Sequence, residues 1–224
     1  MHLKNIIFFI LFLCSSYQLE AFTLLLQPAG DARHPGRSIH GSYERGLSIQ
    51  LAEELKELLE RKDITLNVIV PRFNGQSVEP LQHAAIANRL NVDAYIAIML
   101  YEQQESNAQL GLYTYAADPS DALKTIRTNS LAFIPFDQAH LTNHQTSYRM
   151  ADVLLTSFQA KPLFTIIGNQ VHAIPLKNLT GILAPSVAIE LSIQNTKKIK
   201  EYAQSLADAL HTMLQSLKQW SLPA

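Results

Sequence analysis

The sequence predicts an α/β fold in which a mainly parallel, twisted sheet of about six strands carries helices on both faces. Short, almost wholly apolar segments alternate along the chain with segments whose apolar residues recur at helical spacing. The apolar segments are too continuous for strands with one wet face, which indicates a sheet covered on both sides. With 224 residues, 47% hydrophobic and 17% charged, the chain is long and apolar enough to bury one sizeable core.

The first half of the chain predicts the order strand, helix, strand, helix, strand. Residues 22–27 form a compact apolar run that ends at a Pro-Ala-Gly turn, and this pattern indicates a buried first strand. From Glu44 onward, leucines recur at helical spacing with charged residues between them, as in an amphipathic helix. The same patterns predict a strand over 65–70, a helix over 81–90 and a strand over 94–100.

The second half adds further strands and two helices. We expect a strand over 110–115, a helix over 147–159, and strands over 163–167, 171–174 and 186–191. The polar stretch 117–143 is the least patterned region, and we interpret it as an extended loop. A long helix closes the chain, with an apolar stripe that predicts burial of Ile199, Ala203, Leu206, Leu210, Met213, Leu214 and Leu217.

The N-terminus has the pattern of an export signal. Lys4 supplies a positive charge, and the apolar run 6–14 is too short to span a bilayer. We therefore expect a signal peptide over residues 1–21 and one domain over 22–224, with no membrane span after cleavage. The mature chain then has no cysteine, since Cys14 is the sole one, and this fits a periplasmic or secreted bacterial protein.

The charge balance argues against nucleic acid as a partner. The formal net charge is −1 and the isoelectric point is near 6.7. Binding to a phosphate backbone needs a clustered basic surface, and the lysines and arginines of this chain are scattered.

Several short segments together resemble one family. Residues 27–36 read QPAGDARHPG and residues 41–44 read GSYE, followed by the leucine-rich helix. This resembles the pattern D-P-G-H-G-G-x-D-P-G-A, then G-x-x-E-K, of the zinc-dependent N-acetylmuramoyl-L-alanine amidases of bacterial cell walls. The segments VPR at 70–72, IAN at 86–88 with VDAYIAIM at 92–99, and APSVAIEL at 184–191 resemble later motifs of the same family in the same order.

The resemblance implies an amidase fold of the phosphorylase/hydrolase-like type and a specific set of site residues. Its active members hold zinc with a His in the first loop, a Glu at the start of the first helix and a His at the end of the third strand. A second Glu acts as the base. Zinc lowers the pKa of bound water toward about 7 and polarises the amide carbonyl. Carried over, the metal Glu falls on Glu44 and the catalytic Glu on Glu190, but the two His positions fall on Gly30 and Met99.

A site without imidazole is not expected to hold zinc in the three-ligand geometry of the family. The main hypothesis is therefore a pseudoenzyme: an exported amidase-fold protein without a cofactor that binds peptidoglycan fragments or acts in envelope regulation. An alternative is an active amidase with an altered metal site, in which zinc is regained through His34, His40 or Glu102. A further alternative is an envelope adaptor that binds protein, suggested by the unpatterned region 117–143.

The Glu190 side chain needs a partner under each of these hypotheses. A carboxylate inside the apolar run VAIEL is unfavourable to bury unless it is paired. We expect either a functional cleft or an ion pair, for example with Arg33 or Arg72. We expect Glu102 to be a solvent-facing loop residue, and His83 to have a structural or helix-surface role.

Overall fold

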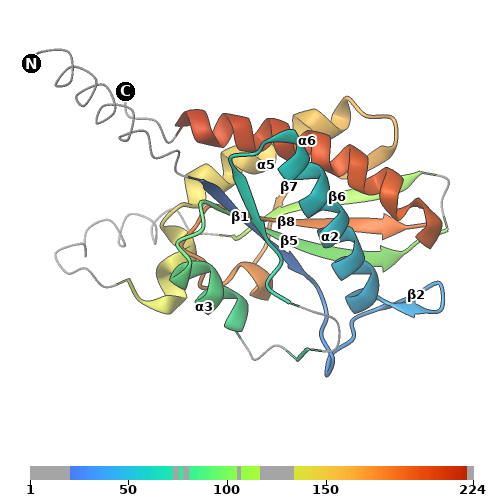
Figure 1. The fold of residues 1–224 in the computed structure, drawn as a ribbon, viewed down its shortest axis with the longest axis horizontal. Coiled ribbons are helices and arrows are strands. Elements are labelled where there is room, and N and C mark those ends of the chain that lie inside the picture. Colours follow the sequence, from blue (N-terminus) through green and yellow to red (C-terminus); the bar gives the residue numbers. More distant parts are fainter. Residues whose placement is uncertain (1–20, 73–75, 78–80, 105–106, 117–133, 221–224) are drawn as a thin grey trace, which may run out of the picture.

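The computed structural model describes residues 21–72, 76–77, 81–104, 107–116 and 134–220 (Figure 1). A six-stranded sheet of order β4-β1-β5-β8-β6-β7 forms its centre. The strands are β1 (Phe22–Pro28), β4 (Leu66–Ile69), β5 (Ala94–Glu102), β6 (Ala108–Thr114), β7 (Phe164–Ala173) and β8 (Ser186–Ile193). The α-helices are α2 (Glu44–Lys62), α3 (Gln82–Arg89), α5 (His144–Gln159) and α6 (Ile199–Trp220). The predicted α/β fold with a mostly parallel sheet is confirmed.

The predicted signal peptide lies outside the described residues, apart from Ala21. Within the described ranges, no helix has both the length and the apolar character that a membrane crossing requires.

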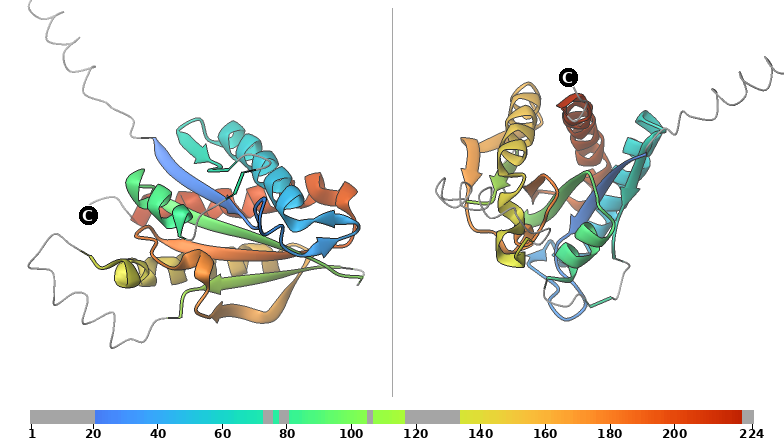
Figure 2. Two further views of the ribbon diagram at one scale, coloured as in Figure 1. Left: turned by 90° about the horizontal axis from the view of Figure 1, so that it is seen from below. Right: turned by 90° about the vertical axis from the view of Figure 1, so that its left-hand side faces the viewer.

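Both faces of the sheet are buried, as the continuous apolar strands indicate. In β1, Leu24 and Leu26 pack into the larger core, which also contains the apolar stripes of α2, α5 and α6. Leu25 points to the opposite face and packs with Tyr95 and residues of α3. Figure 2 shows α5 and α6 on one side of the sheet and α3 on the other. Successive side chains of a strand point to opposite faces, so a strand covered on both sides is apolar throughout.

The sheet reverses direction between β8 and β6. Strands β4, β1, β5 and β8 are parallel to one another, β6 is antiparallel to β8, and β7 is parallel to β6. In this register Glu190 of β8 lies between Met99 of β5 and Gly111 of β6. Residues opposite each other on neighbouring strands point to the same face, so Met99 and Glu190 share one side of the sheet.

Three local predictions differ from the structure. The pattern after the first strand predicts a loop that continues to about Gly41, but this segment contains a hairpin of β2 (Ser38–Ile39) and β3 (Ser42–Tyr43) (Figure 1). The two strands expected over 163–174 are one strand, β7, because Gly168 and Asn169 take positive φ and form an irregularity without ending the pairing with β6.

The third difference concerns the extended loop expected over 117–143. Residues 117–133 lie outside the described residues, but Phe136–Leu141 form the 3₁₀ helix η1, so the prediction was wrong there. His140 of η1 is buried, and its ring centroid lies 3.8 Å from that of Tyr115. A tertiary contact therefore orders a segment whose own sequence has no regular pattern.

Asp63 joins the end of α2 to the last turns of α6. Its Oδ2 accepts hydrogen bonds from Nζ of Lys218 at 2.6 Å and from Nε2 of Gln215 at 3.1 Å. Its Oδ1 accepts from the backbone N–H of Thr65 at 2.9 Å. Burial opposes ionisation, but the hydrogen bonds from Lys218 and Thr65 outweigh it and hold the pKa of Asp63 well below its usual range.

Replacing Asp63 with Asn should therefore destabilise the protein in a pH-dependent way. A depressed folded-state pKa gives stability that is complete above the unfolded pKa of about 3.9 and is lost as the pH falls through the folded value. We expect D63N to lower the free energy of unfolding at pH 7 by about 1–3 kcal/mol, and by less at pH 3, as measured by urea denaturation. D152N, at an exposed position of α5, is the control. Equal losses in the two variants would contradict the role of Asp63.

Candidate functional site

The carboxylate of Glu44 ties three segments together. Glu44 is the first residue of α2 and is 6% exposed. Its Oε1 accepts a hydrogen bond from the backbone N–H of Leu100 in β5 at 2.8 Å. Its Oε2 accepts from the backbone N–H of Arg37 in the first loop at 3.1 Å. Both oxygens are thus engaged by backbone donors that position the loop against the end of β5.

Glu190 is paired with Arg37. Its Oε1 lies 2.6 Å from Nη1 of Arg37, and its Oε2 accepts a hydrogen bond from the hydroxyl of Tyr113 at 2.8 Å. The Glu190 side chain is 16% exposed, whereas that of Arg37 is 53% exposed. The expected ion pair is present, but Arg33 and Arg72 were the wrong partners. Arg37 reaches Glu190 because Glu44 holds its backbone beside the same strand ends.

The charges of this cluster favour the protonated forms of Arg37 and Tyr113. Burial lowers the pKa of Arg37, but the hydrogen bond and charge of Glu190, with the charge of Glu44, outweigh burial and raise it. Burial raises the pKa of the Tyr113 phenol, and the Glu190 carboxylate raises it further. At neutral pH, Arg37 is therefore a cation and Tyr113 a neutral hydrogen-bond donor.

A surface hollow of about 460 Å³ opens beside this cluster and is lined by Arg37, Ser38, Tyr101, Glu102 and Glu190. The guanidinium carbon of Arg37 lies 5.7 Å from the ring centroid of Tyr101, within the range of a cation–π contact. The hollow thus offers an aromatic ring and charged groups of both signs to a polar ligand. Among the residues that the structure describes, no group of three His, Cys, Asp or Glu side chains is placed to hold a metal ion.

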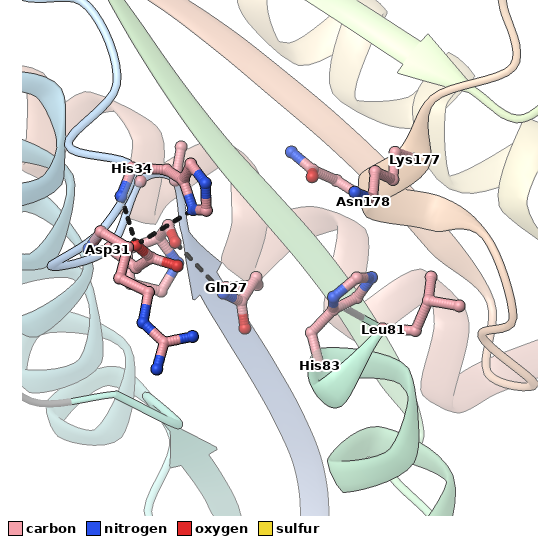
Figure 3. Close-up of a pocket in the computed structure, with 11 residues that line it drawn as sticks. Gln27, Asp31, His34, Leu81, His83, Lys177 and Asn178 are labelled. Atoms are coloured by element: carbon pink, nitrogen blue, oxygen red, sulfur yellow. Dashed lines mark hydrogen bonds and ion pairs between the residues drawn. The ribbon is translucent and has the colours of Figure 1, made fainter. Parts of the chain in front are cut away.

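Two further cavities lie at the carboxyl end of β1. The larger, of about 420 Å³, has Gln27, Asp31 and His34 on one side and Leu81, His83, Lys177 and Asn178 on the other (Figure 3). The smaller, of about 220 Å³, shares Gln27 and His83 with the larger one and is also lined by Arg72.

Arg72 and His83 are buried in the walls of these cavities. Arg72 is 2% exposed and donates hydrogen bonds to the carbonyl oxygens of Ala29 and Gly30, which hold the first loop. His83 is 8% exposed, and burial lowers its pKa, so its imidazole is neutral at pH 7. The expectation of a structural or helix-surface role for His83 did not anticipate its place in a cavity wall.

The sequence profile of one family, N-acetylmuramoyl-L-alanine amidase, matches residues 25–216. The chain belongs to the N-acetylmuramoyl-L-alanine amidase family. No curated protein sequence matches the chain.

Solved structures of amidases have the same fold. The N-acetylmuramoyl-L-alanine amidase from Clostridium difficile 630 is 17% identical, with 91% of this chain and 100% of that chain covered and a TM-score of 0.59. The amidase Ami1 from Mycobacterium smegmatis is 14% identical, with coverages of 91% and 99% and a TM-score of 0.64. The CwlD amidase from Clostridioides difficile, solved in complex with the GerS lipoprotein, is 15% identical, with coverages of 89% and 100% and a TM-score of 0.55. At these identities the likeness shows the fold.

The structure gathers the positions that the amidase resemblance assigns to the metal site. Met99 lies opposite Glu190, and Leu100, the next residue, donates to Glu44. Gly30 follows β1 with φ of +73°, and a Cβ there would lie 3.0 Å from Cβ of Arg45, the residue after Glu44. The two acidic residues of the predicted amidase site thus lie together, with Arg37 between them.

The histidines of the first loop have partners elsewhere. Nδ1 of His34 is 3.6 Å from Oδ1 of Asp31, and the His34 side chain is 83% exposed. His40 is in the β2–β3 hairpin, where its Nε2 lies 2.8 Å from the carbonyl oxygen of Ile193 and its backbone N–H donates to Glu102 at 2.7 Å. The expectation of a loop position for Glu102 was wrong, because Glu102 is the last residue of β5 and holds this hairpin.

Sequence reasoning missed Arg37 and Tyr113. Arg37 belongs to a loop without periodicity, and Tyr113 belongs to the strand expected over 110–115, to which we assigned no function. One signal was present in β6, where Gly111 and Tyr113 share a face. A Cβ at Gly111 would lie 2.6 Å from the Tyr113 hydroxyl, so the glycine leaves room for the phenol to reach Glu190.

Two glycines of the first loop provide a test of the Glu44 position. Gly36 and Gly41 have nearly the same φ, +78° and +76°, and an L side chain is strained at both by about 1–2 kcal/mol. A Cβ at Gly36 would lie 2.5 Å from Oε2 of Glu44, whereas a Cβ at Gly41 meets nothing within 4 Å. We expect G36A to lower the free energy of unfolding by about 1–3 kcal/mol more than G41A in urea denaturation. Similar losses would show that Glu44 does not pack against Gly36.

Proposed function

We propose that this protein is an exported member of the amidase family that binds peptidoglycan without hydrolysing it. The observation that carries the proposal is the position of Arg37, whose guanidinium pairs with Glu190 at 2.6 Å and whose backbone N–H binds Glu44. The resemblance implies a zinc ion beside these two acidic residues in active amidases. In this protein a side chain of the same chain supplies the positive charge.

The donor set does not fit zinc. A catalytic zinc site takes three protein ligands, usually imidazole, carboxylate or thiolate, and keeps one position for water. Both oxygens of Glu44 already accept backbone hydrogen bonds, Gly30 has no side chain, and Met99 offers only a neutral, soft thioether. These residues therefore offer no electrophile to polarise an amide carbonyl.

Glu190 is part of a hydrogen-bonded pair in the wall of the hollow. Both of its oxygens are engaged, one by Arg37 and the other by the Tyr113 hydroxyl. Each oxygen keeps a second lone pair, through which the carboxylate can hydrogen-bond to a ligand in the hollow. The hollow beside Glu190, with Tyr101 and Arg37 in its wall, is suited to holding a polar ligand.

Zinc analysis, a muropeptide-release assay and sacculus co-sedimentation test this proposal on the purified protein. We expect far less than one zinc per chain after dialysis against zinc, no release of peptide stems from sacculi, and pelleting with sacculi above a serum albumin control. Stoichiometric zinc together with released stems would refute the proposal.

An active amidase with an altered metal site is the alternative, and the convergence of Glu44 and Glu190 at one place favours it. Under this alternative, E190Q abolishes stem release, while E102Q, which changes the neighbouring carboxylate of the hollow, leaves it largely intact. Under the main proposal, neither variant changes the background level of stem release. An E190Q rate equal to that of an active wild type would reject Glu190 as the base.

A third possibility is an envelope adaptor that binds a protein. The structure of CwlD in complex with the GerS lipoprotein supports it, because that amidase fold is seen with a protein partner. Sacculus co-sedimentation separates the two binding functions. Strong pelleting of this protein with purified sacculi would count against the adaptor, and its absence would count against the main proposal.

A further inference from the structure

The two cavities at the end of β1 form a second candidate site, which we call the β1 cleft. Their volumes are about 420 and 220 Å³, and they share Gln27 and His83 in their walls. The cleft lies between the first loop, the start of α3 and the 3₁₀ helix η2 (Lys177–Leu179). Glu44, Arg37 and Glu190 do not line it, so it is separate from the hollow at the acidic pair.

Two buried side chains of the cleft have an unpartnered polar atom. In the described part of the chain, four buried side-chain polar atoms have no hydrogen-bond partner, and two of them are Nε of Arg72 and Nε2 of His83. Arg72 is 2% exposed and His83 is 8% exposed. A buried polar atom without a partner is unfavourable, and these two belong to side chains that line one cleft, where a ligand can supply the partners.

The charges of the cleft favour an anion. Among the described residues that line it, the cations are Arg33, Arg72 and Lys177, and the carboxylate is Asp31. Oδ1 of Asp31 already accepts the backbone N–H groups of Arg33 at 2.7 Å and His34 at 2.6 Å. The positive charges therefore exceed the negative charge, which attracts an anionic ligand.

The neutral polar groups of the cleft favour a peptide over a simple ion. Gln27, Asn178 and Gln82 line it with side-chain amides, which both donate and accept hydrogen bonds and so match peptide groups. Figure 3 shows the Asn178 side chain extending across the opening toward His34. A ligand that has both amides and a carboxylate can bind to the side-chain amides and to the cationic side chains of the cleft.

We propose that the β1 cleft binds a carboxylate of the peptidoglycan peptide stem through Lys177 and Nε of Arg72, with Nε2 of His83 hydrogen-bonding to the adjoining peptide group. This inference rests on the proposed function, because it assumes that the ligand is peptidoglycan. It adds a subsite that selects the acidic part of the stem.

Calorimetry with a defined probe tests the cleft. The probe is N-acetylmuramoyl-L-alanyl-D-glutamate, compared with the same compound with both carboxylates amidated and with inorganic phosphate. We expect the wild type to bind the acid at least about tenfold more tightly than the amide, because only the acid is anionic. K177M should lose about tenfold in affinity for the acid, while K197M, at an exposed lysine, should match the wild type.

A second variant, H83F, tests ligand binding by the cleft even if Lys177 contributes only charge. H83F keeps a ring in the buried space and removes the unpartnered Nε2, so we expect the variant to fold. We expect it to lose most of its affinity for the acid. H83F that folds and binds like the wild type would overturn the proposal, as would equal affinity of the wild type for acid and amide. Phosphate binding as tight as that of the acid would show an adventitious ion only.

Sacculus co-sedimentation of the same variants separates the two proposals. If the wild type pellets with sacculi but does not discriminate between acid and amide, the cleft proposal fails and the proposed function stands. If the wild type binds the acid through Lys177 and His83 but does not pellet, peptidoglycan binding fails while carboxylate recognition by the cleft stands.

Discussion

The hydrogen bonds to the carboxylate of Glu44 are the constraint on which the site depends. One oxygen accepts the backbone N–H of Leu100 in β5 and the other accepts that of Arg37 in the first loop. A buried carboxylate must be satisfied in this way, and here the donors come from segments far apart in the sequence. These hydrogen bonds hold the first loop against the first turn of α2 and the end of β5. Arg37 is thereby placed beside Glu190.

The site also shows how the folded chain accommodates two neighbouring acidic side chains. Two carboxylates close together repel each other unless a cation lies nearby. The guanidinium of Arg37 meets this requirement from within the chain, and the Tyr113 hydroxyl satisfies the second oxygen of Glu190. Both acidic residues therefore take part in the hydrogen bonding that holds the first loop, Glu44 through the backbone of Arg37 and Glu190 through its guanidinium.

The β1 cleft and the acidic pair are connected through the first loop. Gly30 lines the cleft, and its carbonyl oxygen accepts a hydrogen bond from Arg72, whose buried Nε has no partner. The same loop continues to Gly36 and Arg37 at the acidic pair. A ligand bound at Arg72 would therefore contact the residues that position the loop.

The amino-acid sequence predicted the α/β class and the order of the main helices and strands, because apolar periodicity and strand order depend on local pattern. The assignment of Glu44 and Glu190 to one site came from the family resemblance. The sequence pattern did not determine the direction of β6, since an apolar strand has the same pattern whether it runs parallel or antiparallel. Tertiary structure alone decided the partners: Arg37 lies 153 positions from Glu190 and Tyr113 lies 77 positions from it. The orphaned nitrogens of Arg72 and His83 are likewise visible only in the folded chain, because burial without a partner is a property of packing and has no local sequence pattern.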